Sequence, residues 1–151
     1  MTYDTVIDEL LTYLPELRAY DEGTFHYLDT NPPLPHIIFG SLLIPFLEIA
    51  LETGDLKHIL RTCAFLEEAS ESARSDNGLR SLIQIEIGEW LSRTPLEEKI
   101  APWLGSETKR IANFVPGLAT QRLNIREERM QNSISARART LLDKLFKVGA
   151  K

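Results

Sequence analysis

Apolar residues recur every three or four positions along most of this chain, which is the spacing of amphipathic helices. In the first such segment the apolar positions are Val6, Ile7, Leu10, Leu11 and Leu14. Strict alternation of apolar and polar residues, which is typical of strands, is scarce. The pattern predicts an all-α fold of seven to eight helices, arranged as a helical bundle or as a short stack of antiparallel helical hairpins.

Turn signals mark several of the expected helix boundaries. The run "TGD" at 53–55 predicts a tight helical hairpin, because Gly54 suits the left-handed position that ends a helix and Asp55 suits the next N-cap. The run "TPLEE" predicts another helix start, in which Thr94 caps the first turn and Glu97 stands at the capping-box position three residues later.

The most apolar segment is the helix expected over 36–53, which we expect Pro45 to kink because proline removes one backbone hydrogen bond. Its continuous apolar run, 37–47, is too short to span a bilayer. The first residues, "MTYDTVIDELL", are acidic where a signal peptide needs basic residues. The single cysteine, Cys63, excludes an internal disulfide. We therefore expect a cytoplasmic protein with no membrane partner.

The charge of the chain is unevenly distributed. Residues 1–117 hold 9 basic and 19 acidic residues, a net charge of −10, whereas residues 118–151 hold 8 basic and 3 acidic residues, a net charge of +5. We expect one helical domain over 1–151, with an acidic body and a basic C-terminal segment that ends in an amphipathic helix around 134–146. The two blocks could attract each other within one fold, or one of them could serve as a binding surface.

Three successive helices each carry a carboxylate on or beside an apolar face. At 100° per residue, Glu86 falls in the middle of the apolar stripe of the helix at 79–91, and Glu67 falls inside the apolar face of the preceding helix. In the helix at 36–53, Glu48 and Glu52 share the only polar strip. An unpaired buried carboxylate is costly, so each of these must find donors, change its pKa or reach solvent.

Three interpretations of Glu67 and Glu86 are open at this point. They could be structural buried carboxylates that cap a neighbouring helix or pair with an arginine; the candidate arginines are Arg61, Arg80 and Arg110. They could belong to a dinuclear metal site, but such sites need Glu-x-x-His spacing, and the nearest match, "DLKH", places His58 on the wrong face. They could also line an acidic groove. We favour the structural interpretation and predict no metal.

No pattern indicates catalysis. The chain has no nucleophile motif and no glycine-rich phosphate loop, and Cys63 lies on an apolar helix face, where packing is its expected role. We therefore predict a non-enzyme without catalytic residues or cofactors. The basic run at 121–139 lacks interleaved aromatic residues, and the acidic body would repel phosphate, so we expect no direct contact with nucleic acid.

The middle of the chain resembles a family of small all-helical bacterial proteins that are encoded beside secreted or contact-delivered toxins and are regarded as immunity proteins. The resembling stretches are "PHIIFGSLLIPFLEIALETGD", "ILRTCAFLEEASES", "LIQIEIGEWL" and "WLGSETKRI", which together cover about residues 35–112. They share helix-packing features and not catalytic motifs, and the basic C-terminal segment has no counterpart.

The resemblance implies an immunity protein that binds and neutralises a cognate toxin acting in the cytoplasm. A nuclease effector, possibly delivered by type VI secretion, is the preferred toxin, because an acidic inhibitor surface complements the basic cleft of a nuclease. The expected oligomeric state is a monomer or weak homodimer. The alternative is a helical adaptor or regulatory protein-binding module unrelated to toxins. The expected partner-binding residues are Glu48, Glu52, Glu68, Glu71 and Glu89.

Overall fold

The computed structural model describes residues 1–148, and all of its regular structure is helical: helices make up 76% and those residues contain no strand. The predicted all-α class is therefore confirmed, with eight helices in the described residues when directly continuous segments are counted as one and the short 3-10 turn η1 is left out. The segments are α1 (Val6–Tyr13), α2 (Glu16–Glu22), η1 (Tyr27–Asp29), α3 (Pro35–Ile38), η2 (Phe39–Leu43), α4 (Ile44–Thr53), α5 (Leu56–Ser72), α6 (Asn77–Leu82), η3 (Ile83–Gly88), α7 (Glu89–Leu91), α8 (Glu97–Ile100), η4 (Ala101–Trp103), α9 (Ser106–Ile111) and α10 (Leu118–Val148).

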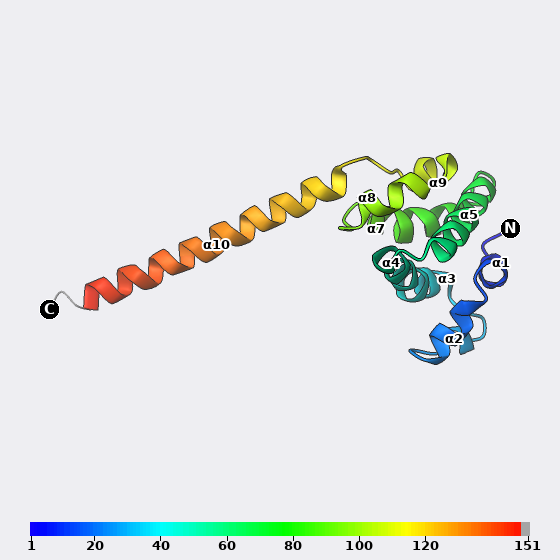
Figure 1. Cartoon of the computed structure of the whole chain (residues 1–151), viewed down its shortest axis with the longest axis horizontal. Coiled ribbons are helices and arrows are strands. Elements are labelled where there is room, and N and C mark those ends of the chain that lie inside the picture. The colour runs from blue at the N-terminus through cyan, green and yellow to red at the C-terminus, as the bar shows by residue number, and fades with distance from the viewer. Residues whose placement is uncertain (149–151) are drawn as a thin grey trace.

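Helix α5 is the centre of the body, which we define as residues 1–117. It contacts α1, α4, α6 and α9, so the other helices pack around it (Figure 1). Phe65 and Leu66 on α5 are fully buried, and the ring of Phe39 lies 5.9 Å from that of Phe65. Cys63 is also buried, and burial raises the pKa of its thiol to about 12, so this cysteine packs as an apolar residue.

Two helices contain a widened turn. Segments α3, η2 and α4 form one continuous helix in which the Ile44 N–H donates to the carbonyl of Phe39, five residues earlier, and thus forms a π turn. The irregularity expected at Pro45 is therefore a π turn immediately before the proline, where the helix must adapt to a residue without an N–H. Segments α6, η3 and α7 form a second such helix, and the π segments η2 and η3 contact each other.

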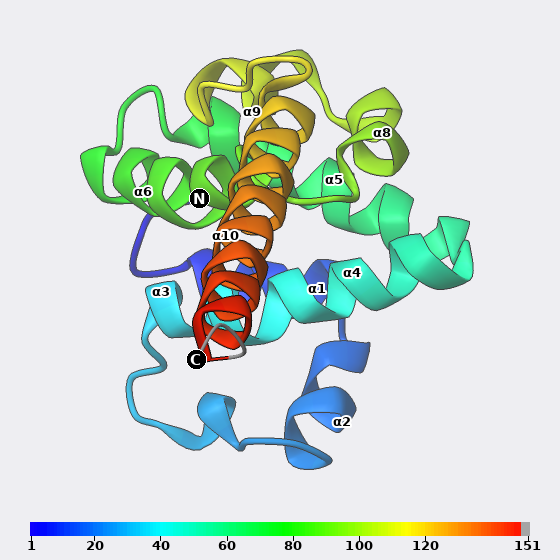
Figure 2. The same cartoon turned by 90° about the vertical axis from the view of Figure 1, so that its left-hand side faces the viewer.

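The helix Pro35–Thr53 is long and apolar enough to cross a membrane by length and composition, with a mean hydropathy of 1.5 over its most apolar stretch. The apolar run on which the sequence expectation rested is shorter than this helix. One such helix is weak evidence, because the core helix of a soluble protein passes the same test. Here it lies beside the α6–α7 helix on one side of the body (Figure 2).

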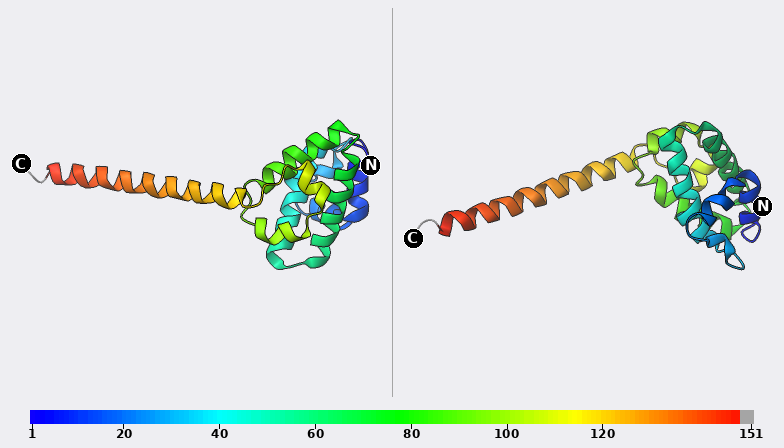
Figure 3. Two further views of the ribbon diagram at one scale, coloured as in Figure 1. Left: turned by 90° about the horizontal axis from the view of Figure 1, so that it is seen from above. Right: turned by 60° about the horizontal axis from the view of Figure 1, so that its bottom comes forward.

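Helix α10 leaves the body and projects away from it over nearly its whole length (Figures 1 and 3). At a rise of 1.5 Å per residue its 31 residues extend about 46 Å. Ala119 is its only buried residue. Near that end, Arg122 Nη1 donates to Ser92 Oγ at 2.9 Å. The amphipathic helix predicted around 134–146 is thus the far end of one long helix; the last three residues of the basic segment, 149–151, lie outside the described residues.

The capping box predicted at Thr94 and Glu97 does not form. Thr94 Oγ1 accepts instead from the N–H of Leu96 at 3.2 Å, and α8 begins only at Glu97. The carboxylate of Glu97 binds the start of α10 instead, where it accepts from the N–H groups of Gly117 at 2.9 Å and Ala119 at 3.4 Å. Glu97 is buried, so this pair of bonds holds the first turn of α10 against the body.

Replacing Gly88 with alanine should destabilise the fold. A Cβ at Gly88 would lie 2.7 Å from the backbone carbonyl oxygen of Ala112, which cannot move without shifting the end of α9. We expect a loss of about 1–3 kcal/mol in the free energy of unfolding, measured by urea denaturation. Gly23→Ala is the control, because its Cβ would meet nothing closer than 3.5 Å. Equal stability of the two variants would contradict the close approach at Gly88.

Candidate protein-binding surface

Glu67 caps the first turn of α9. Its carboxylate accepts from the N–H groups of Glu107 at 3.0 Å and Thr108 at 2.9 Å, and from the Thr108 hydroxyl at 2.8 Å. Gly105 makes this possible, because a Cβ at that position would occupy the space of the Glu67 carboxylate. The sequence left three interpretations of Glu67 open. The structure agrees with the one in which Glu67 caps a neighbouring helix.

The bonds to α9 also change the ionisation of Glu67. Desolvation is the largest single influence and raises its pKa, but the hydrogen bonds from Thr108 and Glu107 together outweigh it and lower the pKa below 4.5. Glu67 therefore stays charged at neutral pH, where a negative charge beside the N-terminus of α9 is favourable.

Glu86 lies in the π segment η3 and joins the two π-containing helices. Its Oε1 lies 2.9 Å from Nδ1 of His36. On the η2 side, a Cβ at Gly40 would come within 2.6 Å of Glu86 Oε2, so the glycine leaves room for the carboxylate. The Glu86 side chain is 20% exposed. Glu86 is therefore a partly buried link between helices.

The arginines proposed as partners of Glu67 and Glu86 pair elsewhere. Arg61 binds Glu16, with Nη1 and Oε1 3.0 Å apart, and Arg110 binds Glu107 at 2.8 Å. Arg80 donates to the carbonyl of Arg74 at 3.1 Å. The interpretation in which Glu67 and Glu86 pair with these arginines was wrong, because all three guanidinium groups bind other acceptors.

Three of the five expected partner-binding glutamates belong to α4 and α7. Both helices lie on the side of the body from which α10 projects (Figure 1). Glu48 is partly buried and accepts from the indole N–H of Trp90 at 2.9 Å, so it holds α4 to α7. Glu52 lies one turn further along α4, and Glu89 directly precedes Trp90. Both are exposed, and within the described part of the chain neither side chain makes a hydrogen bond or ion pair. We call Glu48, Glu52 and Glu89 the α4–α7 face.

The other two glutamates belong to a different side of the body. Glu68 on α5 accepts from the hydroxyl of Tyr13 on α1, and this hydrogen bond is the main cause of the raised pKa of Tyr13. Glu71 follows on the same side of α5 and is exposed. We call Glu68 and Glu71 the α5 face. The structure thus separates the predicted binding residues into two groups, one on α4 and α7 and the other on α5.

Sequence reasoning missed or misassigned several carboxylates that carry structural bonds, among them Asp21 and Glu97. Asp21 is 1% exposed and accepts from the N–H groups of Tyr27 and Leu28, both at 2.8 Å, which anchors the loop after α2. An acid in the last turn of a helix opposes the helix dipole, and this was the one available signal for Asp21. For Glu97 the sequence predicted a local capping role, whereas the structure shows it binding the start of α10.

No group of three or more His, Cys, Asp or Glu residues comes together in a metal-binding arrangement within residues 1–148. His58, in the "DLKH" run, binds the Asp55 carboxylate at 2.6 Å and lies 3.5 Å from Glu16. These contacts join α2 to the start of α5.

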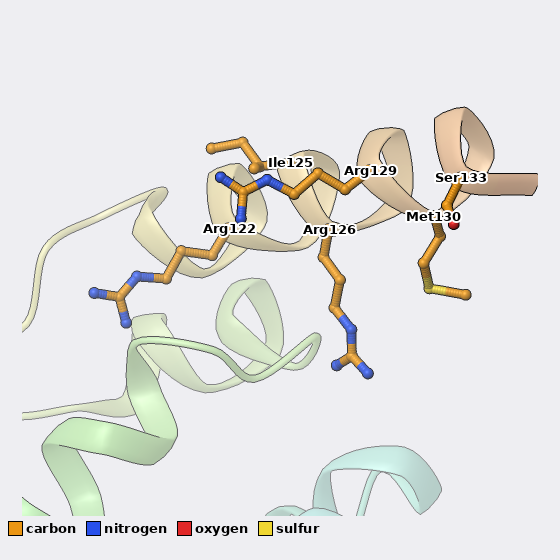
Figure 4. A pocket seen from close by; sticks show the side chains of 6 residues that line it. All are labelled: Arg122, Ile125, Arg126, Arg129, Met130 and Ser133. Atoms are coloured by element: carbon orange, nitrogen blue, oxygen red, sulfur yellow. The ribbon is translucent and has the colours of Figure 1, made fainter. Parts of the chain in front are cut away.

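A shallow depression lies on α10 itself. Its lining residues are Arg122, Ile125, Arg126, Arg129, Met130 and Ser133 (Figure 4). All six come from one helix, so the depression is part of an open helical surface. Its lining combines basic and apolar side chains, and such an open surface suits a protein partner better than an enclosed small molecule.

The chain matches no family model, no curated protein and no solved structure. The resemblance to immunity-type proteins therefore stays a prediction. The geometry shows a helical body in which many carboxylates have structural bonds, while three of the five expected partner-binding glutamates, Glu52, Glu71 and Glu89, are exposed without them.

Removing the carboxylate of Glu67 should destabilise the protein by about 1–2 kcal/mol, the usual cost of losing a helix cap. Glu67→Ala leaves two N–H groups at the start of α9 without their acceptor, whereas Glu67→Gln keeps one acceptor oxygen and should lose less. Urea denaturation measures both. Glu71→Ala on the same helix is the control, and we expect it to stay within about 0.5 kcal/mol of wild type.

Stability should fall as the pH drops from 4.5 towards 2, in part because of Glu107. Hydrogen bonds from Arg74 and Arg110 lower its pKa from 4.5 to about 2. The unfolded chain therefore binds a proton at a higher pH than the folded chain, and acid favours unfolding in this window. In Glu107→Gln, which does not titrate, urea unfolding measured across this window should depend less on pH. A parallel decline in both proteins would contradict the assignment.

Proposed function

We propose that this protein acts by binding another protein, and that its partner is a cognate toxin that it neutralises in the cytoplasm. The observation that supports this most is the acidic body, which carries a net charge of −10 and presents exposed carboxylates without internal partners on the α4–α7 face. Those carboxylates contribute nothing visible to the fold, and they are held on helices linked by the Glu48–Trp90 and His36–Glu86 contacts. A rigid charged surface of this kind loses little entropy on binding.

A nuclease is the preferred toxin because its substrate is a polyanion. Nucleases present basic clefts to phosphate, and an acidic inhibitor surface attracts such a cleft over long range and speeds association. In this proposal the chain acts without catalysis, metal or cofactor, and it contacts neither nucleic acid nor membrane.

Of the two acidic faces, the α4–α7 face is our choice for toxin binding. It lies on the side from which α10 projects, so the body and the helix together form an angled surface (Figures 1 and 2). Within that face, Glu52 and Glu89 are the residues free to bind. Glu48 is less suitable as a test position, because replacing it also removes the hydrogen bond from Trp90.

The test uses the double variant Glu52→Lys with Glu89→Lys. We expect protection of cells that co-express the neighbouring toxin gene to weaken, association to slow and its salt dependence to decrease, with an unchanged melting temperature. Glu71→Lys on the α5 face is the matched control and should protect as wild type does. A weaker complex with Glu71→Lys alone would move the site to the α5 face.

The toxin proposal itself has a separate outcome. If cells making the wild-type protein still die, and a pull-down recovers no complex with the toxin, the immunity function is wrong. If the complex forms at low salt with equal affinity for wild type and double variant, the partner stands and the acidic-surface mechanism fails.

Helix α10 favours a second candidate function, a helical adaptor unrelated to toxins. A long exposed helix with apolar side chains along it is a common means of joining proteins. Genomic neighbourhood distinguishes the two, because an immunity gene should directly follow a toxin gene and an adaptor gene need not.

A further inference from the structure

Helix α10 carries a mainly apolar stripe that is exposed beyond its first position, Leu123, which is partly buried. Its positions are Leu123, Glu127, Met130, Ile134, Ala138, Leu141 and Leu145. Ile134 is 62% exposed and Leu145 70%, although large apolar side chains in such a row are normally covered. The stripe spans 23 residues, and its first and last positions are about 33 Å apart along the helix. This length indicates an extended partner rather than a small ligand.

The stripe also runs nearly straight along the helix. Leu123, Ile134 and Leu145 are each 11 residues apart, which is close to three full helical turns. A second straight helix could therefore follow it from end to end without strong supercoiling.

The spacing of the stripe reads the same in both directions. The intervals are 4, 3, 4, 4, 3 and 4 residues, with Ile134 at the centre. An antiparallel pair of identical helices related by a two-fold axis places residue i opposite the residue equally far beyond the centre. Leu123 then faces Leu145 of the second copy, Met130 faces Ala138, and Ile134 faces itself. Glu127, which faces Leu141, is the one charged member.

We propose that α10 is a homodimerisation helix, and that two copies of this chain pair antiparallel through the stripe centred on Ile134. The stripe shares no residue with the α4–α7 face, and the proposal does not depend on the proposed function.

Charge supports the antiparallel direction. From Arg137 onwards α10 carries four basic residues, Arg137, Arg139, Lys144 and Lys147, against one acid, Asp143, whereas the body has a net charge of −10. Antiparallel pairing brings this basic half beside the acidic body of the second copy. Parallel pairing would place the two acidic bodies together at one end and the two basic halves together at the other, which like-charge repulsion disfavours.

The basic side chains lie on the appropriate edge of the helix. Arg126 points to the side of α10 on which the body lies (Figure 4). Arg137 and Lys144 follow it by 11 and 18 residues, about three and five turns, so they continue along the same edge. A two-fold axis perpendicular to the helix pair keeps both bodies on this edge, so these two residues face the body of the second copy.

The first experiment measures the mass of the full chain in solution by light scattering at micromolar concentration. We expect a dimer of the 17.2 kDa chain, and a monomer would overturn the proposal. Ile134→Glu places a carboxylate against its own copy at the centre and should give a monomer. Asn132→Glu adds the same charge on the opposite side of α10 and should remain dimeric. Circular dichroism checks that both variants keep the helical content of wild type, as expected because Ile134 is exposed and outside the core.

The second experiment determines direction. One tagged chain carries Leu123→Cys, another carries Leu145→Cys, and both carry Cys63→Ala. After mixing and oxidation, the antiparallel arrangement predicts a disulfide mainly between the two different variants. Disulfides confined to like variants would overturn it. Arg137→Glu with Lys144→Glu should also shift the equilibrium towards monomer at low salt, and an unchanged dimer would remove the charge argument. Failure of the toxin test leaves all of these outcomes unaffected.

Discussion

Backbone N–H groups at the starts of short helices impose the constraint on which this fold depends. A helix leaves its first N–H groups without partners inside the helix, and the body contains several helices of only a few turns. Carboxylates supply the acceptors. Glu67 and Glu97 come from other helices and bind the starts of α9 and α10, whereas Asp76 is the N-cap of α6 itself and also accepts from the N–H of Tyr3. Each bond fixes an angle between elements as well as a helix end. The acidity of the body is therefore partly architectural.

Local periodicity predicted the helical class and most helix positions, because both follow from near neighbours in the chain. The partners of the carboxylates could not be predicted, because they are remote: Glu67 and Thr108 are separated by 41 positions, Glu97 and Ala119 by 22. The sequence identified Glu67 as a carboxylate in need of donors, yet left open whether those were N–H groups or a guanidinium. At Glu97 the local capping-box pattern was present, and a long-range acceptor role replaced it.

The position of Glu86 shows a different limit of prediction from the sequence. A helical wheel at 100° per residue assumes regular α-helical turns, and η3 is a π segment with more residues in each turn. Side chains beyond such a turn lie at other angles than the wheel predicts. Glu86 is consequently only partly buried, at the contact of η2 and η3, where it meets His36 and the open space at Gly40. Its place in an apparently apolar stripe is thus a consequence of the widened turn.

The carboxylates of the body fall into two groups, those with structural bonds and those available for recognition. Glu48, Glu67, Glu86 and Glu97 are occupied by donors within the chain, so only part of the body's negative charge is free to act on a partner. Helix α10 presents the reverse case, since nearly all of its surface, apolar and basic, is exposed and the body holds it only at its first turns. An exposed apolar stripe persists in solution at the risk of unspecific association. The antiparallel dimer that we propose would limit that risk, because the second copy needed to cover the stripe is always present at the same concentration.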